Sequence, residues 1–252
     1  MGIKEKIKIL IKGVAIPIII FVGISLFVGL IFNSYIGKDG DFNPVIAQGV
    51  ADIFIFIIYL PLYIRFRKNK KLKSKDFAFS YCLFMIPLAF SLCLLGNTIL
   101  NCFFDLSKNV VSSEVELIFE KYGFFLCFII VAVLVPIIEE MLYRGFIYDA
   151  CTIVGNEIVA IIVSSLLFSI MHGNIEQMIY ALYASIFFSY VRYKYKSVIY
   201  TIILHVLMNL TTLVFSEPII LAKGIKEKAF IIFISLAILI ITIYRMNYRK
   251  NI

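Results

Sequence analysis

The sequence has few of the residues that cover a water-exposed surface. Charged residues make up 16% of the 252 positions, hydrophobic residues make up 62%, and tryptophan is absent. A soluble domain is typically about one quarter charged. The composition therefore excludes a soluble globular protein, a disordered chain and a coiled coil. We predict that the chain lies in a lipid bilayer, in the cell membrane of a bacterium or archaeon.

Patterns for disulfides, zinc fingers and nucleic acid are also missing. The cysteines are odd in number, widely spaced and without a Cys-x-x-Cys pair: Cys82, Cys93, Cys102, Cys127 and Cys151. Such spacing fits neither a disulfide framework nor a zinc finger, so we interpret them as small apolar side chains. The net charge is +8, but the basic residues cluster beside apolar runs and do not alternate with exposed aromatics. This arrangement indicates membrane orientation and no nucleic-acid partner.

Long apolar runs predict an all-α, polytopic membrane bundle. A run of about 18 to 20 apolar residues crosses a bilayer as a helix. We expect eight spans in one integral membrane domain, residues 1–252: Gly13–Phe32, Val45–Ile64, Phe77–Leu100, Tyr122–Ile138, Glu157–His172, Ile175–Val191, Val198–Phe215 and Ala229–Tyr244. Ser113 and Glu116 have the spacing of a capping box, so the fourth helix is expected to begin early. With eight alternating spans and a cytoplasmic N-terminus, 18 of the 24 basic residues lie on the cytoplasmic side, which predicts that both termini are cytoplasmic.

Two adjacent glutamates follow the fourth apolar run without a break in the helical pattern. Glu140 and Arg144 are four residues apart, so they share a helix face and can pair. Glu139 is rotated by about 100° from Glu140 and has no local partner. Burial and the neighbouring carboxylate disfavour its charged form, which suits a general base. The alternative is that both glutamates lie in water at a helix end and that Arg144 is an orientation anchor.

The two histidines of the chain each belong to a pair spaced by four residues. Phe168 and His172 form one pair, and His205 and Asn209 form the other. Such spacing places both side chains of a pair on one helix face. A lone membrane histidine is more often a packing residue, but His205 and Asn209 together offer the donors that an oxyanion requires.

Glu-Glu-x-x-x-Arg, Phe-x-x-x-His and His-x-x-x-Asn, in this order on membrane helices, resemble the motifs of the CPBP family. These are the CAAX-processing and bacteriocin-processing intramembrane proteases, also called the Abi family. The resemblance covers Tyr122–Phe215 and implies a catalytic core at about residues 113–215. It further implies an endopeptidase whose site lies inside the bilayer and opens to the cytoplasm.

The resemblance implies a role for each motif residue. Glu139 would activate the attacking water with help from His172, and His205 and Asn209 would stabilise the tetrahedral oxyanion. The substrate would be a membrane-associated peptide or protein.

Three further motif residues have supporting roles under this resemblance. Glu140 and Arg144 would hold the first motif in shape, and Phe168 would line the cavity. For His172 to reach the site, the segment Glu157–Val191 must form a short or tilted hairpin. Because non-helical backbone in a bilayer must be shielded from lipid, we expect the apex of this hairpin to lie within the protein.

Alternatives to a metal-free peptidase stay open at this stage. Glu139, His172 and His205 could bind zinc with an open position for water, although the sequence has no His-Glu-x-x-His motif; we favour no cofactor. The chain could also be a non-catalytic immunity or accessory protein of the same fold. A transporter or proton relay ranks last, because Gly13–Leu100 holds only scattered polar residues such as Asp52 and Asn97. The oligomeric state is not predicted.

Overall fold

A computed structural model describes residues 1–35, 44–70, 72, 77–104, 123–126, 128–221 and 224–248. These residues form helices and turns, and no strand occurs among them. The expected all-α membrane bundle is therefore confirmed. The capping box predicted at Ser113 and Glu116 lies outside the described residues.

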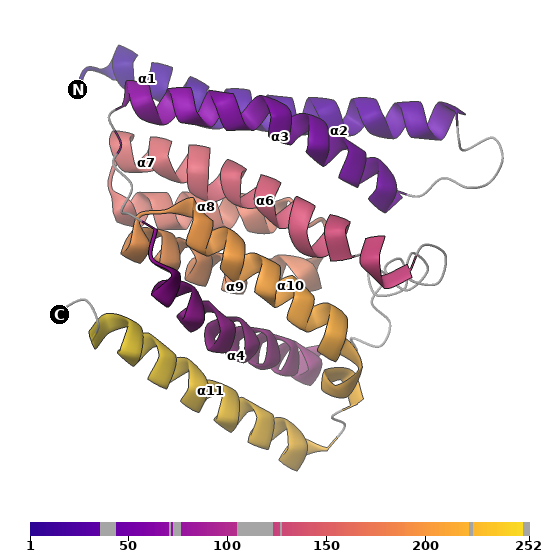
Figure 1. The fold of residues 1–252 in the computed structure, drawn as a ribbon. Coiled ribbons are helices and arrows are strands. Elements are labelled where there is room, and N and C mark those ends of the chain that lie inside the picture. Colours follow the sequence, from indigo (N-terminus) through magenta and orange to yellow (C-terminus); the bar gives the residue numbers. More distant parts are fainter. Residues whose placement is uncertain are drawn as a thin grey trace.

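The order of the helices along the chain can be followed in Figure 1. Within the described residues, three stretches are π-helical, with the wider i to i+5 register. The elements are α1 (Ile3–Leu10), η1 (Ile11–Ala15), α2 (Ile16–Tyr35), α3 (Pro44–Asn69), α4 (Phe79–Phe103), η4 (Phe128–Leu134), α6 (Val135–Glu140), η5 (Met141–Ile147), α7 (Tyr148–Val154), α8 (Glu157–Ile170), α9 (Ile175–Tyr195), α10 (Val198–Leu221) and α11 (Ile225–Tyr248).

Each predicted span overlaps one of these helices. Five of them are long and apolar enough to cross a membrane: Ile3–Ser34, Val45–Asn69, Phe79–Phe103, Gly123–Val154 and Ile225–Tyr248. The apolar helix α8 has 14 residues, which at 1.5 Å per residue covers about 21 Å. This is shorter than the roughly 30 Å hydrocarbon core, so α8 is a partial span, as the sequence indicated.

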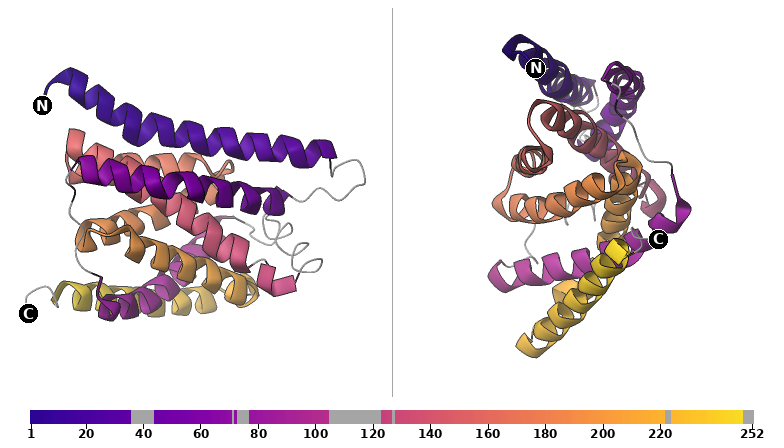
Figure 2. Two further views of the ribbon diagram at one scale, coloured as in Figure 1. Left: turned by 45° about the horizontal axis from the view of Figure 1, so that its top comes forward. Right: turned by 90° about the vertical axis from the view of Figure 1, so that its left-hand side faces the viewer.

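The motif-bearing helices occupy the middle of the bundle. α2 and α3 form one flank and α4 and α11 form the other, with α6, α7, α8, α9 and α10 between them in all views (Figures 1 and 2). The first turn of α1 and the last turn of α11 lie at the same end of the bundle (Figure 1). The motifs are therefore enclosed by helices that carry no motif.

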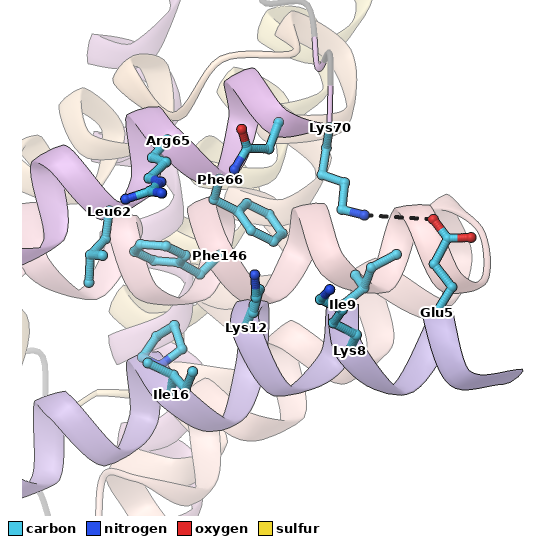
Figure 3. A pocket seen from close by; sticks show the side chains of 12 residues that line it. Glu5, Lys8, Ile9, Lys12, Ile16, Leu62, Arg65, Phe66, Lys70 and Phe146 are labelled. Carbon is cyan, nitrogen blue, oxygen red and sulfur yellow. Dashed lines mark ion pairs between the residues drawn. The ribbon is translucent and has the colours of Figure 1, made fainter.

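The N-terminal helix crosses the motif helix, which is the helical stretch that carries the Glu-Glu-x-x-x-Arg motif, at a glycine. A Cβ atom on Gly13 would lie 2.5 Å from the Cβ of Ala150 and 3.0 Å from the ring of Phe66, so only glycine permits this approach. Small residues at crossings let membrane helices pack closely. Beside this crossing lies a cavity between α1 and α3 (Figure 3).

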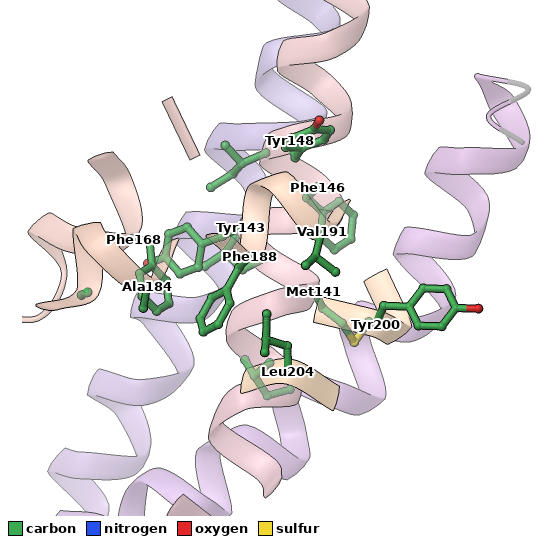
Figure 4. Packing of buried hydrophobic residues seen from close by; sticks show 14 of the residues in the cluster. Met141, Tyr143, Phe146, Tyr148, Phe168, Ala184, Phe188, Val191, Tyr200 and Leu204 are labelled. Carbon is green, nitrogen blue, oxygen red and sulfur yellow. The ribbon is translucent and has the colours of Figure 1, made fainter. Parts of the chain in front are cut away.

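The interior around the motifs is filled by aromatic and aliphatic side chains. Phe168, Phe188 and Tyr143 converge there with Leu204 of α10 (Figure 4), and all four are at most 3% exposed. Close packing of this kind keeps polar groups in its midst in one arrangement.

The turn between α8 and α9 corrects one expectation. Met171, Gly173 and Asn174 are exposed at the surface of the protein, so the prediction that the hairpin apex is enclosed is wrong. Asn174 caps α9, because its side chain accepts a hydrogen bond from the Gln177 backbone at 2.8 Å, and Gly173 adopts a positive φ of 77°. A tight, capped turn of this kind satisfies much of its own backbone, which reduces the need for enclosure.

Candidate active site

The first motif lies on one continuous helical stretch that runs from η4 through α6 and η5 to α7. The sequence predicted that this helix continues past Ile138, and the structure confirms it as far as Val154. Pro136 has no N–H for the usual i to i−4 hydrogen bond, and the π-helical register of η4 directly precedes it. π-Helical turns are often found at functional sites, and here two of them flank Glu139 and Glu140.

Glu140 and Arg144 form a fully buried ion pair. Arg144 Nη1 donates to Glu140 Oε1 at 3.0 Å, and both side chains are 0% exposed. Arg144 Nη2 donates to the backbone oxygen of Ser185 on α9 at 3.2 Å and also to its hydroxyl. The pair thus ties η5 to α9, while Glu140 Oε2 and Arg144 Nε are buried without a hydrogen-bond partner among the described residues.

Two phenylalanines enclose the guanidinium group of Arg144. Its Cζ lies 4.5 Å from the ring centroid of Phe168 and 5.1 Å from that of Phe188. Both contacts are in the range of a cation–π interaction. Phe168 therefore contacts the motif arginine, in addition to the cavity-lining role that the resemblance implied.

His205 connects this ion pair to Glu139. Its Nδ1 lies 3.0 Å from Glu140 Oε1, and its Nε2 lies 3.7 Å from Glu139 Oε2. The imidazole stacks on the Phe188 ring, with centroids 4.7 Å apart. Because the Glu140 carboxylate only accepts hydrogen bonds, Nδ1 carries a proton and Nε2 faces Glu139.

The environments of the two glutamates differ. The Glu139 side chain is 19% exposed, whereas that of Glu140 is 0% exposed. Glu139 therefore remains partly exposed, and Glu140 Oε1 is shared by Arg144 and His205.

His172 lies on the opposite edge of Phe168. Its Nδ1 is 2.8 Å from the Phe168 carbonyl oxygen, and because that oxygen only accepts, Nδ1–H donates and leaves the Nε2 lone pair free. The Phe168 ring contacts both imidazoles, with centroid distances of 4.7 Å to His172 and 5.8 Å to His205. Glu139 has no direct hydrogen bond or ion pair with His172 among the described residues; its recorded close contact is with His205.

Asn209 holds the motif helix through the backbone. Its Nδ2 donates to the Val131 carbonyl oxygen of η4 at 2.9 Å. One of its two amide protons is therefore committed to the helix, and the other remains for a ligand. The sequence did not indicate this structural hydrogen bond between Asn209 and Val131.

Asp52, named above as a scattered polar residue, is a buried carboxylate on a helix that packs against the first motif. Its side chain is buried on α3, Gln48 donates to its Oδ1 at 2.8 Å, and its Oδ2 has no hydrogen-bond partner. α3, which carries Asp52, packs on α6, the helix that carries Glu139. The only sequence signal was a carboxylate in the second apolar run.

A second buried ion pair joins the motif helix to α9 and α3. Arg192 on α9 donates to Asp149 and, through Nε, to the Arg144 carbonyl oxygen at 2.9 Å. Arg67 on α3 lies 3.3 Å from the other oxygen of Asp149. Sequence analysis counted Arg192 and Arg67 only as orientation signals, because nothing in a sequence shows that a basic residue near a helix end turns inward.

The zinc alternative requires three donors that share one point. No group of three or more His, Cys, Asp or Glu side chains in the described part of the chain is placed to hold a metal ion. Both histidines commit Nδ1 to other partners, which leaves only Nε2 of each ring as a donor to a metal. Glu139, His172 and His205 do not fit as a metal site, so no step is derived through a metal.

The middle of the chain matches a known protein family. Residues 121–211 match the family model of the type II CAAX prenyl endopeptidase Rce1-like proteins. No curated protein and no solved structure matches the chain. The matched region contains all three motifs and every residue of the buried network except the α3 side chains. The similarity to the CPBP family of CAAX-type intramembrane proteases, predicted from the motifs, is thus confirmed for this region of an integral membrane protein.

Proposed function

We propose that the protein is an intramembrane endopeptidase of the glutamate type, which hydrolyses a peptide bond in a membrane-associated peptide or protein. The observation that carries the proposal is the contrast within the first motif. Glu139 is partly exposed and lies 3.7 Å from His205 Nε2, while Glu140, Arg144 and the other ring nitrogen of His205 are fixed in a buried network. A reactive carboxylate beside a rigid supporting network is the arrangement that general-base catalysis needs.

In this proposal Glu139 accepts a proton from a water molecule as the water oxygen attacks the scissile carbonyl carbon. The free Nε2 lone pair of His172 accepts a second hydrogen bond from the same water and orients it. The proton held by Glu139 then passes to the leaving amine nitrogen, so that a carboxylic acid and an amine are released. Glu139 returns to its ionised form and no covalent intermediate is required.

The oxyanion formed in the attack would be stabilised by donors from α10. His205 donates Nδ1–H to Glu140, so Nε2 can donate a hydrogen bond to the oxyanion only when the ring is in its imidazolium form. The positive charge of the imidazolium would then attract the negative oxyanion. Asn209 would contribute the amide proton that Val131 does not use. Fixed donors of this kind lower the barrier because they need no reorganisation during the reaction.

The decisive variant is Glu139→Gln, which keeps the size of the side chain and removes the base. We expect loss of activity by a factor of about 100 or more, with unchanged thermal stability of the purified protein. The measurement is a comparison of membrane and secreted peptides from cells carrying wild-type or variant protein. Glu227→Gln on α11 is the matched control and should leave the peptides unchanged. If Glu139→Gln kept the full biological effect, the protein would act by binding, as an immunity or accessory protein does.

Metal dependence is tested separately on purified protein. We expect peptidase activity to survive exhaustive chelation, because the donor set around Glu139 does not converge on one point. Loss of activity that added zinc restores would contradict the metal-free mechanism.

A further inference from the structure

A cavity between the N-terminal helix and α3 combines an apolar floor with a cationic rim. Its volume is about 500 Å³. The apolar lining residues come from α1, α2, α3 and η5: Ile9, Ile16, Pro17, Leu62, Phe66 and Phe146. None of the proposed catalytic residues contributes to it, so the cavity is separate from the active site.

The charge of the lining is strongly positive. Lys8 and Lys12 lie four residues apart on one face of the N-terminal helix and extend towards α3, which carries Arg65 (Figure 3). Glu5 is the one acidic lining residue, and it lies 3.9 Å from Lys70. Within the described residues no carboxylate pairs with Lys8, Lys12 or Arg65, and all three are exposed. Three cations therefore face the cavity without an internal counter-ion.

We propose that this cavity binds the headgroup of an anionic phospholipid. Basic pockets between membrane helices recognise anionic lipid headgroups, and the three free cations are opposite in sign to a phosphate group. A free phosphate ion would make no use of the apolar floor, whereas the glycerol backbone and the first part of an acyl chain of a phospholipid would lie on it. Ile16 is 41% exposed and Leu62 is 38% exposed, so the floor continues onto the apolar outer face where that chain would run.

The site is connected to the motif helix through Phe146. This residue lies two positions after Arg144, is 2% exposed, and packs edge-on against Tyr59 and Tyr63 of α3 at 5.3 and 5.2 Å. A lipid on the cavity floor would therefore contact η5 and hold α1 and α3 against it. We expect lipid binding to stabilise the whole bundle, because a ligand that binds only the folded state shifts unfolding to higher temperature.

The test uses the purified full-length protein in a neutral detergent. Retained lipids are counted by native mass spectrometry, and thermal unfolding is followed with added phosphatidylglycerol, phosphatidylcholine, glycerol 3-phosphate or inorganic phosphate. We expect wild-type protein to retain and be stabilised by phosphatidylglycerol and not by the other three. Equal effects of phosphatidylcholine, or an equal effect of either soluble phosphate, would overturn the proposal.

A charge variant and a matched control locate the binding. The triple variant Lys8→Gln, Lys12→Gln, Arg65→Gln should bind phosphatidylglycerol on the order of 100-fold more weakly, the factor for three cations near a lipid surface. The control Lys6→Gln, Lys68→Gln, Arg245→Gln removes the same charge from exposed positions that do not line the cavity, and should bind as wild type does. Equal loss in both variants would show general surface attraction and refute the site. If the cavity variant did not fold, the comparison of lipids on wild-type protein would still decide.

Discussion

Glu139 and Glu140 are adjacent in the sequence but point in different directions, because a helix turns by about 100° per residue. Glu140 points into the bundle, where Arg144 and His205 share its Oε1. Glu139 points to a partly open position beside His205. Two identical side chains therefore have different environments, and the geometry of the helix decides which one remains partly exposed.

The buried ion pair makes a prediction about stability. Arg144→Met leaves the Glu140 carboxylate buried with one fewer partner, and breaking such a pair costs about 3–5 kcal/mol of unfolding free energy. The double variant Glu140→Gln, Arg144→Met removes both charges and should recover much of that loss. Thermal unfolding of the purified variants measures both effects. Equal stability of the single variant and wild type would mean that the pair is not a structural support.

At the scale of elements, π-helical turns adapt the motif helix to its neighbours. The η4 turn precedes Pro136, and the carbonyl oxygen of Val131 within it receives a hydrogen bond from Asn209 on α10. This bond fixes α10, and with it His205, relative to Glu139. Irregular helix geometry thus connects two motifs that lie about 70 residues apart in the sequence.

The crossing of η1 and α7 gives a prediction at the same scale. Gly13→Ala places a Cβ within 2.5 Å of that of Ala150, so the helices must separate, at a cost of about 1–3 kcal/mol. Gly23→Ala is the control on α2, because nothing lies within 4 Å of its added Cβ. It should be neutral or slightly stabilising, since alanine favours a helix more than glycine does. Thermal unfolding that ranks the two variants in the opposite order would contradict the close crossing.

The positions of the helices could be predicted from the sequence, but the helices that pack against each other could not. Apolar runs located the helices, and spacing by four placed Glu140 with Arg144 and Phe168 with His172 on common faces, because both signals are local. The packing of α3, which carries Asp52, on α6, and the ion pair of Arg192 with Asp149, join helices that are distant in sequence. Nothing in their spacing shows which helices pack together. The exposed turn at Gly173 was mispredicted because its capping by Asn174 was not considered.

At the scale of the whole molecule, the basic residues gather at one end of the bundle. Ion pairs at this end link α1 to the segment after α3 through Glu5 and Lys70, α3 to α7 through Arg67 and Asp149, and α8 to Lys196 after α9. The lipid cavity opens at this end too. At the opposite end, Lys228 of α11 donates to the Asn101 carbonyl oxygen of α4 at 2.7 Å. Among the described residues, the basic side chains are therefore more frequent at one end of the bundle than at the other, as the positive-inside rule describes for an oriented membrane protein.

This asymmetry predicts that the cationic end faces the cytoplasm. The exposed Cys102 marks the opposite end, next to Asn101, and Lys6 marks the cationic end. In a background where the other four cysteines are alanine, a membrane-impermeant maleimide should label Cys102 in intact cells. Lys6→Cys, with Cys102 also replaced by alanine, should be labelled only after the cells are permeabilised. Labelling after permeabilisation shows that this cysteine is reactive and so serves as the control. Labelling of Lys6→Cys in intact cells would show the inverted topology, and would contradict the expectation that the site opens to the cytoplasm.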